Sequence, residues 1–275
     1  MKHYLTYKFK DSKSFVSTYD ELPLWSAPFG LLLLNHVELR SGLTVVDLGC
    51  GAGFPLIELA ERLGPDSTVY GIDPWGNAGD RVNQKIKNYG IAHVKFIQAS
   101  AAHIPLADGS VDLIVSNLGV NNFANPETVF VECFRVLKKG GKLVLTTNLR
   151  GHWEQFYKIF YSTLQQHNKA EYITVLKKEE EQRRTIEGVS ALFTDAGFAI
   201  SRCIPESFEM NFLNGTSFLN HHFIKLGWLT SWLQLFPKRH WKTIFGALEK
   251  ELNDFAEKNT GLRLTVPMAF VEGRK

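Results

Sequence analysis

The chain has 275 residues, of which 44% are hydrophobic and 21% are charged, and its formal net charge is +3. This length suits one α/β domain with insertions, and the mild charge forms no basic patch of the kind that binds nucleic acid. Three cysteines without a C-x-x-C pair predict neither a disulfide framework nor a metal site. No apolar stretch is as long as a signal-peptide core or a membrane span, so we expect a cytoplasmic protein without stable membrane insertion.

The segment 15–39 carries apolar residues at helical spacing. This pattern predicts a helical lead-in that precedes the first strand. Tyr19 and Trp25 belong to its apolar face, and both can pack as core side chains beneath a sheet.

The most informative stretch follows the first predicted strand, where three glycines stand at alternate positions before a predicted helix. Gly49, Gly51 and Gly53 permit backbone conformations and close approaches that a Cβ would forbid. Asp47 precedes them, and Pro55 after them has the φ angle of a first helical turn. Such a strand, turn and helix can carry the polar part of a nucleotide-like ligand, although a tight turn without a ligand would also fit.

The spacing of these glycines separates two classes of ligand. A dinucleotide-binding turn reads G-x-G-x-x-G, which would place the third glycine where Phe54 stands. The pattern Asp47-x-Gly49-x-Gly51-x-Gly53 instead resembles the first motif of class I S-adenosylmethionine-dependent methyltransferases. The resemblance implies an α/β, Rossmann-like fold, with a seven-stranded, mostly parallel sheet, an antiparallel last strand, helices on both faces, and helical lid insertions. It also implies S-adenosyl-L-methionine as cofactor and S-adenosyl-L-homocysteine as product.

A second acidic residue, Asp73, ends the predicted strand 68–72. It follows Gly53 by 20 residues, the distance at which a carboxylate at the tip of the second strand accepts hydrogen bonds from two ribose hydroxyls. Pro74 and Trp75 come next. The flat ring of Trp75 can cover a purine face, or it can simply wedge the loop.

The predicted strand 94–98 leads to the segment where the family places an acid that holds the adenine amino group. Here Ser100 stands at that position, and a hydroxyl accepts more weakly than a carboxylate. Adenine recognition would then be shared with the backbone of Ala101 and with Trp75. His103 is expected on the surface.

The tip of the predicted strand 113–116 is rich in amide side chains, since Asn117, Asn121 and Asn122 lie within six residues of one another. The resemblance places the meeting point of methyl donor and acceptor at this tip. We expect a site role for Asn117 together with Leu118. For the other two asparagines, acceptor positioning and ordinary turn chemistry remain open.

The rest of the chain completes the predicted sheet and adds helical material. A fifth strand (143–148) is followed by a sixth (199–212) and by a final antiparallel strand (263–272), and the resemblance covers most of residues 43–198 plus the final strand. The expected organisation is one methyltransferase domain, 1–275, with a helical lead-in at 1–41, a cofactor-binding core at 43–150, and helical insertions at 151–185 and 213–260 that form a substrate lid.

Methyl transfer from a sulfonium needs an acceptor lone pair in line behind the methyl group, with water excluded. A general base is needed only where the acceptor loses a proton, and the candidates are His152, His221 and His222, each of which also fits a solvent-exposed or capping role. The lead-in is expected to fold over the cofactor. The predicted cofactor-binding residues are Tyr19, Trp25, Asp47, Gly49, Cys50, Gly51, Gly53, Asp73, Pro74, Trp75, Ser100, Ala101, Asn117 and Leu118.

The acceptor is less well defined than the cofactor. Aromatic residues at helical spacing in the second insertion predict a lid over a pocket for a small, partly apolar or aromatic metabolite. The alternatives are a methyltransferase of nucleic acid or protein, a lipid or quinone acceptor at a membrane surface, a nicotinamide-dependent oxidoreductase, and a binding protein without chemistry. We expect a small-molecule substrate and no nucleic-acid partner, and no pattern indicates the oligomeric state.

Overall fold

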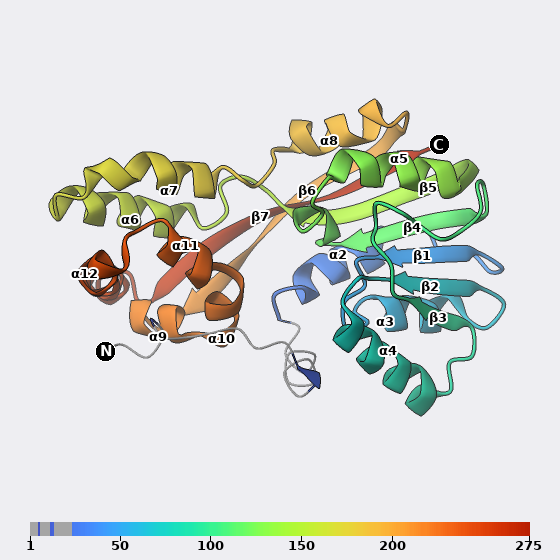
Figure 1. Cartoon of the computed structure of the whole chain (residues 1–275), viewed down its shortest axis with the longest axis horizontal. Coiled ribbons are helices and arrows are strands. Elements are labelled where there is room, and N and C mark those ends of the chain that lie inside the picture. The colour runs from blue at the N-terminus through green and yellow to red at the C-terminus, as the bar shows by residue number, and fades with distance from the viewer. Residues whose placement is uncertain (1–4, 6–11, 14–23) are drawn as a thin grey trace. The chain divides into compact units, whose positions relative to one another are not determined.

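The structure is a computed structural model that describes residues 5, 12–13 and 24–275 (Figure 1). The chain divides into two compact units. The sheet unit comprises residues 10–148, 185–206 and 268–275, and the helical unit comprises residues 1–9, 149–184 and 207–267. Tyr19 lies outside the described residues, so its predicted role stays a prediction.

Within the described residues, seven strands form one mixed sheet in the order β3-β2-β1-β4-β5-β7-β6 (Figure 1). The first five strands pair in parallel, whereas β7 runs antiparallel to β5. The predicted mostly parallel sheet with an antiparallel last strand is confirmed. The strands are β1 (Thr44–Leu48), β2 (Thr68–Ile72), β3 (Val94–Ile97), β4 (Val111–Asn117), β5 (Leu137–Asn148), β6 (Ala199–Phe212) and β7 (Leu262–Arg274).

The carboxyl ends of the parallel strands lie along one edge of the sheet, because neighbouring strands run in the same direction. Asp47 of β1 pairs with Val115 of β4, and Asn117 of β4 pairs with Thr146 of β5. Neighbouring strands are only about 4.8 Å apart. The polar residues at the ends of β1, β2, β4 and β5 are therefore neighbours. We call this edge of the sheet, with Asp47, Asp73, Asn117 and Asn148, the carboxyl edge.

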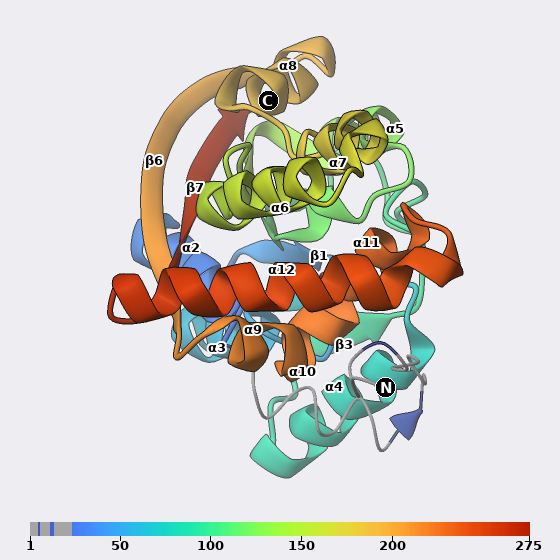
Figure 2. The same ribbon diagram turned by 90° about the vertical axis from the view of Figure 1, so that its left-hand side faces the viewer.

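Helices cover both faces of the sheet, as predicted (Figures 1 and 2). Helix α3 packs on β2, α4 on β3, and α2 on β4 and β5, while α5 contacts β5 and α8. Side chains cap two of these helices: Asn125 accepts from the Thr128 backbone N–H, and Thr185 accepts from that of Gly188. The helices are α2 (Ala27–His36), α3 (Leu56–Leu63), α4 (Gly76–Tyr89), α5 (Pro126–Val136) and α8 (Ile186–Asp195).

Strand β5 begins at Leu137, earlier than the predicted start at Leu143. Its pairing with β4 shifts register between Val111 and Leu113, so that the lysine- and glycine-rich segment after Leu137 bulges but stays extended. Gly140 has a φ of +81° there. The sequence predicted a later start because lysines and glycines are as common in turns as in such a bulge.

A buried ionic cluster joins the antiparallel strands to β5. Glu272 of β7 accepts from Ser201 and Arg202 of β6 at 2.6 and 2.5 Å. The ammonium nitrogen of Lys142 in β5 lies 3.3 Å from the same carboxylate. Burial acts to raise the pKa of Glu272, but the hydrogen bonds from Arg202 and Ser201 and the charge of Lys142 lower it below its ordinary value.

The helical unit consists of short helices and the long α12, which contacts α6 and α9 (Figure 2). Pro237 stands at the N-cap of α12, and the helix therefore starts at Lys238. No helix of the described residues is long and apolar enough to cross a membrane. The elements are α6 (Glu154–Gln166), η3 (Ala170–Tyr172), α7 (Ile173–Glu180), α9 (Gly215–Asn220), α10 (His222–Ile224), the π-helical turn η4 (Lys225–Leu229), α11 (Thr230–Gln234) and α12 (Lys238–Lys258).

The core of the helical unit is aromatic. The rings of Phe156 and Trp232 stack with centroids 4.5 Å apart, and Phe218 meets Trp153 edge to face at 5.4 Å. Such pairs contribute about 0.5–1.5 kcal/mol each beyond their burial. Trp232 also donates from its indole nitrogen to the hydroxyl of Tyr157 at 3.3 Å, so its one polar atom is satisfied.

Candidate functional site

The glycine turn, residues 49–53, follows β1 and is hydrogen-bonded to the end of β2. The backbone N–H groups of Gly49 and Cys50 both donate to the carbonyl of Ile72, at 2.8 and 3.4 Å. Gly49, Gly51 and Gly53 have φ angles of +79°, +50° and +102°, a region that L side chains rarely adopt. The sequence prediction that these positions require glycine for their conformation is in accord with these angles.

The three glycines differ in the atoms that a Cβ at each position would meet. A Cβ on Gly49 would lie 3.3 Å from the Cα of Gly119, and one on Gly53 would lie 3.3 Å from a methyl group of Val82. A Cβ on Gly51 would meet no atom of the described residues within 4 Å. Gly49 and Gly53 therefore permit close packing inside the protein, whereas Gly51 leaves its backbone open to a ligand.

Asp73 connects the end of β2 to the glycine turn. Its Oδ2 accepts from the Gly51 N–H at 2.9 Å, and its Oδ1 accepts from the Trp75 N–H at 2.8 Å. A carboxylate offers about four lone-pair sites, so each oxygen can still accept one further hydrogen bond. Asp73 is only partly buried, and the two remaining sites suit a pair of vicinal hydroxyls.

Asp47 lies fully buried behind the glycine turn. Neither carboxylate oxygen has a hydrogen-bond partner of normal geometry among the described residues. Burial, and next the charge of Asp73, raise the pKa of Asp47 to about 8, against the opposing effect of the Leu56 backbone N–H. A positive charge bound nearby would stabilise the ionised carboxylate. Burial also raises the pKa of Cys50, which stays a thiol.

The residues predicted to face adenine occupy the next two loops. Trp75 packs on Ala52 and remains partly exposed. The carbonyl of Pro74 accepts from the side chain of Gln98 at 3.2 Å, which fixes the loop that carries the ring.

Ser100 is exposed, and its Oγ accepts from the Ala102 N–H at 3.2 Å, while Ala101 between them is buried. This hydrogen bond gives Ser100 a local role in its turn. A contact of Ser100 or Ala101 with adenine stays a prediction.

Asn117 is bound to protein at both ends of its amide. Its Oδ1 accepts from the Thr146 hydroxyl at 2.8 Å, and its Nδ2 donates to the carbonyl of Ser26 at 3.2 Å. Leu118 follows with a φ of +66°, and its N–H donates to the carbonyl of Thr146. Asn117 thus holds the ends of β4 and β5 to the start of α2, next to Trp25.

The sequence prediction missed Asn148, the last residue of β5. It is buried, and its Oδ1 accepts from the Nδ2 of Asn121 at 2.8 Å. Asn121 in turn accepts from the hydroxyl of Thr147 at 2.9 Å. The Nδ2 of Asn148 is buried without a hydrogen-bond partner among the described residues. A run of polar residues ending an otherwise apolar strand was the sequence signal that could have drawn attention to it.

The three histidines proposed as bases belong to the helical unit, so their roles stay predictions. His152 is buried, with its ring stacked on that of Trp228 at 5.6 Å between centroids. Burial, and then the charge of Arg183, hold the pKa of His152 well below its ordinary value, which makes the ring neutral at pH 7. His221 and His222 are exposed.

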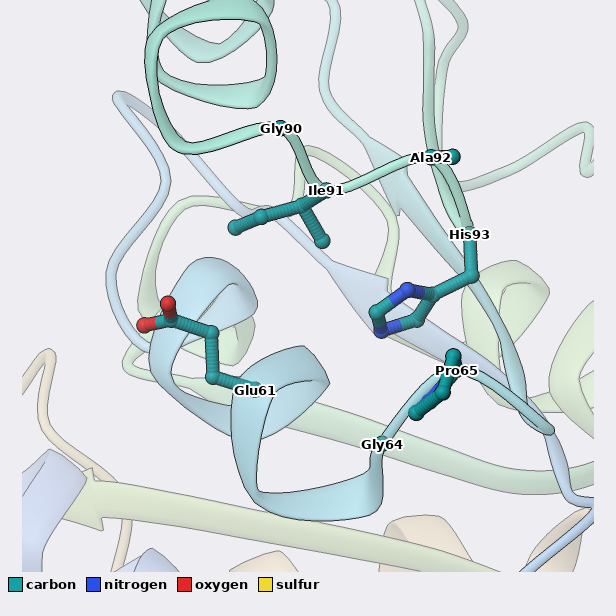
Figure 3. Close-up of a pocket in the computed structure, with 7 residues that line it drawn as sticks. All are labelled: Glu61, Gly64, Pro65, Gly90, Ile91, Ala92 and His93. Atoms are coloured by element: carbon teal, nitrogen blue, oxygen red, sulfur yellow. The ribbon is translucent and has the colours of Figure 1, made fainter.

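A surface pocket of the sheet unit lies away from the carboxyl edge (Figure 3). It is lined by the end of α3 and the connection between α4 and β3, including Glu61, Pro65, Ile91 and His93. These segments precede the amino ends of β2 and β3. The pocket is therefore separate from the glycine turn and Asp73.

Comparison with known proteins agrees with this geometry. A family model described as "Methyltransferase domain" matches residues 39–211. The demethylmenaquinone methyltransferase of Geobacillus sp. (strain WCH70) is 32% identical over 46% of this chain and 55% of its own length. The arsenite methyltransferase of Halobacterium salinarum is 34% identical over 39% of this chain and 28% of its own length. The matches thus span about half the length of these relatives, or less.

The fold has solved counterparts. A SAM-dependent methyltransferase from Aquifex aeolicus superposes with a TM-score of 0.55 at 22% identity, covering 71% of this chain and 93% of that one. At this identity the likeness shows a shared fold alone. The family model covers more than half of the chain and spans the glycine turn, Asp73 and the ends of β4 and β5. The chain therefore belongs to the methyltransferase-domain family of class I fold, whose cofactor is S-adenosylmethionine.

Proposed function

We propose that this protein is an S-adenosylmethionine-dependent methyltransferase that acts on a small, partly apolar or aromatic metabolite. One observation carries the proposal: the backbone at Gly51, which the described residues leave open, stands beside the carboxylate of Asp73, which keeps two acceptor sites that these residues do not use. A ribose with two adjacent hydroxyls can fill those sites while the rest of the nucleoside lies against the open turn. Asp47 behind the turn favours a ligand of positive charge.

The chemistry asks little of the protein beyond positioning. In the transfer, an electron pair of the acceptor, either a lone pair or a π pair of an electron-rich ring, forms the new bond to the methyl carbon while the carbon–sulfur bond breaks and its electron pair stays on sulfur. The sulfonium thereby becomes a neutral thioether, and any proton on the acceptor atom leaves to solvent or to a base. The chain's own residues have to bind both partners in line and exclude water.

The acceptor class is supported by two separate considerations. Several relatives are named demethylmenaquinone methyltransferases, which makes a quinone ring with an apolar tail the specific candidate. The helical unit is rich in aromatic side chains, and we propose that its segments govern the choice of acceptor. His152, His221 and His222 stay candidate bases within it.

Calorimetric titration with S-adenosylmethionine and S-adenosylhomocysteine tests the cofactor assignment. We expect one site per chain in the wild type and a loss of at least about tenfold in affinity for Asp73→Asn, because an amide accepts from at most one of the hydroxyls. Asp80→Asn, an exposed carboxylate on α4, is the matched control and should bind normally. Equal affinities for all three proteins would exclude the ribose role.

Turnover and flotation assays separate the acceptor classes. Release of S-adenosylhomocysteine with demethylmenaquinone supports the quinone candidate, whereas turnover only with water-soluble aromatic metabolites supports a different small molecule. Co-flotation with anionic vesicles that lack quinone would indicate recruitment to a membrane surface. Methylation of RNA, DNA or protein substrates would contradict the small-molecule proposal.

A further inference from the structure

Besides the two oxygens of Asp47, the carboxyl edge contains one buried polar atom, the Nδ2 of Asn148, that the described residues leave without a partner. Asn148 is only 2% exposed, yet its Nδ2 has no hydrogen-bond partner among the described residues. Leaving such a donor unsatisfied costs about 1–3 kcal/mol. A buried amide in this state usually meets a water molecule or a ligand.

The side chain of Asn148 is held in one position by its neighbours. Its Oδ1 accepts from Asn121 at 2.8 Å, and Asn121 is itself fixed by the hydroxyl of Thr147 at 2.9 Å. The hydroxyl of Thr147 also lies 3.2 Å from the carbonyl of Asn148. This closed chain of hydrogen bonds presents the Nδ2 of Asn148 as a fixed donor, which is the property required of a group that orients a substrate.

The place of Asn148 along the carboxyl edge suits the acceptor better than the cofactor. Asp73 ends β2 and the glycine turn follows β1, so a nucleoside bound there extends over β1 and β2. The residues predicted to contact adenine lie beside β3. The strand order places β4 and β5 on the opposite side of β1. Asn148 stands two positions beyond Thr146, the partner of Asn117 at the end of β4.

Asn117 is less suited to this task, because its Nδ2 already donates to Ser26 and its Oδ1 already accepts from Thr146. Asn121 is exposed and bonded at both ends to Thr147 and Asn148. Among the asparagines of these strand ends, Asn148 combines burial with an unused donor. We propose that Asn148 binds the methyl acceptor by donating from Nδ2 to an acceptor oxygen, such as a ring carbonyl or hydroxyl.

This inference rests on the proposed function, and its test uses the complete chain with demethylmenaquinone, oxidised and chemically reduced, as the probe. Asn148→Leu removes the donor with similar volume. Asn148→Asp keeps the oxygen that accepts from Asn121 but replaces the Nδ2 donor with a second oxygen. Asn122→Ala is the control, because Asn122 is an exposed residue of the neighbouring loop.

We expect the acceptor KM to rise about tenfold or more in both Asn148 variants, as befits a lost buried hydrogen bond, with S-adenosylmethionine affinity within about twofold of wild type. Asn121→Ala should raise KM less, because it only loosens the side chain. Asn122→Ala should leave both quantities unchanged. A KM effect without a cofactor effect is something that a purely structural role would not produce.

Three results would overturn the inference. Unchanged KM in Asn148→Leu would mean that the amide holds a water molecule. Full activity in Asn148→Asp would mean that the residue does not act as a donor. Wild-type protein that binds S-adenosylmethionine but does not turn over the probe would remove the assigned ligand class and leave the cofactor site intact. Failure to bind S-adenosylmethionine would instead contradict the proposed function itself.

Discussion

The sheet unit and the helical unit differ in how their cores are filled. At the carboxyl edge of the sheet unit, Asp47 is fully buried, and neither of its oxygens has a hydrogen-bond partner of normal geometry among the described residues. The Nδ2 of Asn148 is likewise buried without a partner in that part of the chain. In the helical unit the large side chains meet one another, as Phe156 and Trp232 do at 4.5 Å. A protein accepts such unsatisfied groups where a ligand completes them. The buried polar atoms of the carboxyl edge therefore mark candidate binding groups in the sheet unit. The helical unit also buries the Nε of Arg183 without a hydrogen-bond partner among the described residues, but its core consists mainly of packed aromatic rings.

The largest expected effect breaks the aromatic packing. Trp232→Ala removes a fully buried ring in contact with Phe156, Phe218 and Tyr157, and should lower the free energy of unfolding by about 3–5 kcal/mol. Leu213→Ala, at a site that is 78% exposed, should change it by less than about 0.5 kcal/mol. Denaturant unfolding measures both. Equal stabilities would show that the aromatic core does not hold the helical unit together.

The ionic cluster of the sheet gives the next effect. Glu272→Gln leaves Arg202 and Lys142 without their shared carboxylate and should cost about 2 kcal/mol, discounted because Arg202 is partly exposed. The pKa of Glu272 is lowered on folding, so its contribution is present above the ordinary carboxyl pKa and is lost as pH falls through the lowered value. Unfolding at pH 7 and pH 3 should therefore show a difference that shrinks in acid. Exposed Glu257→Gln serves as control.

Asp47 supplies a pH effect of the opposite sign. Its pKa is raised to about 8, so the folded protein holds a proton that the unfolded chain releases, and wild-type stability falls as pH rises from about 4 to 8. Asp47→Asn has no such proton and should gain on the wild type across this range, by at most about 1.4 kcal/mol per pH unit. Thermal unfolding of the ligand-free proteins at pH 5 and pH 8 measures this. A stability difference between Asp47→Asn and wild type that is the same at both pH values would contradict the role of Asp47 as a buried acid. Asp66→Asn, at an exposed position, is the control.

The smallest stability effect is expected for two glycines of the sheet unit. Gly42→Ala and Gly51→Ala both place a methyl group at a positive φ, +73° and +50°, where no atom from the described part of the chain lies within 4 Å. Each should cost about 1 kcal/mol of stability. Only Gly51→Ala should weaken S-adenosylmethionine binding in calorimetry, because only Gly51 faces the proposed ligand. Equal loss of binding in both variants would show that strain, and not ligand contact, explains the effect.

The sheet unit could largely be predicted from sequence because local signals mark its parts. Strand β2 lies at the predicted residues 68–72, because its strand formers end at Asp73. Helix α3 follows the glycine turn, as predicted, and ends before Gly64. The β4–β5 bulge was missed because lysine and glycine are common in turns. Strand β6 was nevertheless predicted over residues 199–212, where alternation is clear.

The site was predictable in its residue types and less so in its bonding. The sequence predicted Asp47, Asp73 and Asn117 at strand ends, but no pattern could tell that the amide of Asn117 is engaged at both ends. The position of the Asn148 side chain, and with it that of its Nδ2, depends on a hydrogen bond from Asn121, which is distant in sequence. Contacts of this kind arise from strand register, which periodicity does not specify.

A crystal structure of the protein with S-adenosylhomocysteine would show whether the carboxyl edge holds the cofactor. We expect both ribose hydroxyls within hydrogen-bond distance of the Asp73 carboxylate and the ligand in contact with the backbone of Gly51. Ligand density elsewhere, for example in the pocket beside Glu61 and His93, or an empty carboxyl edge at saturating ligand, would contradict this expectation.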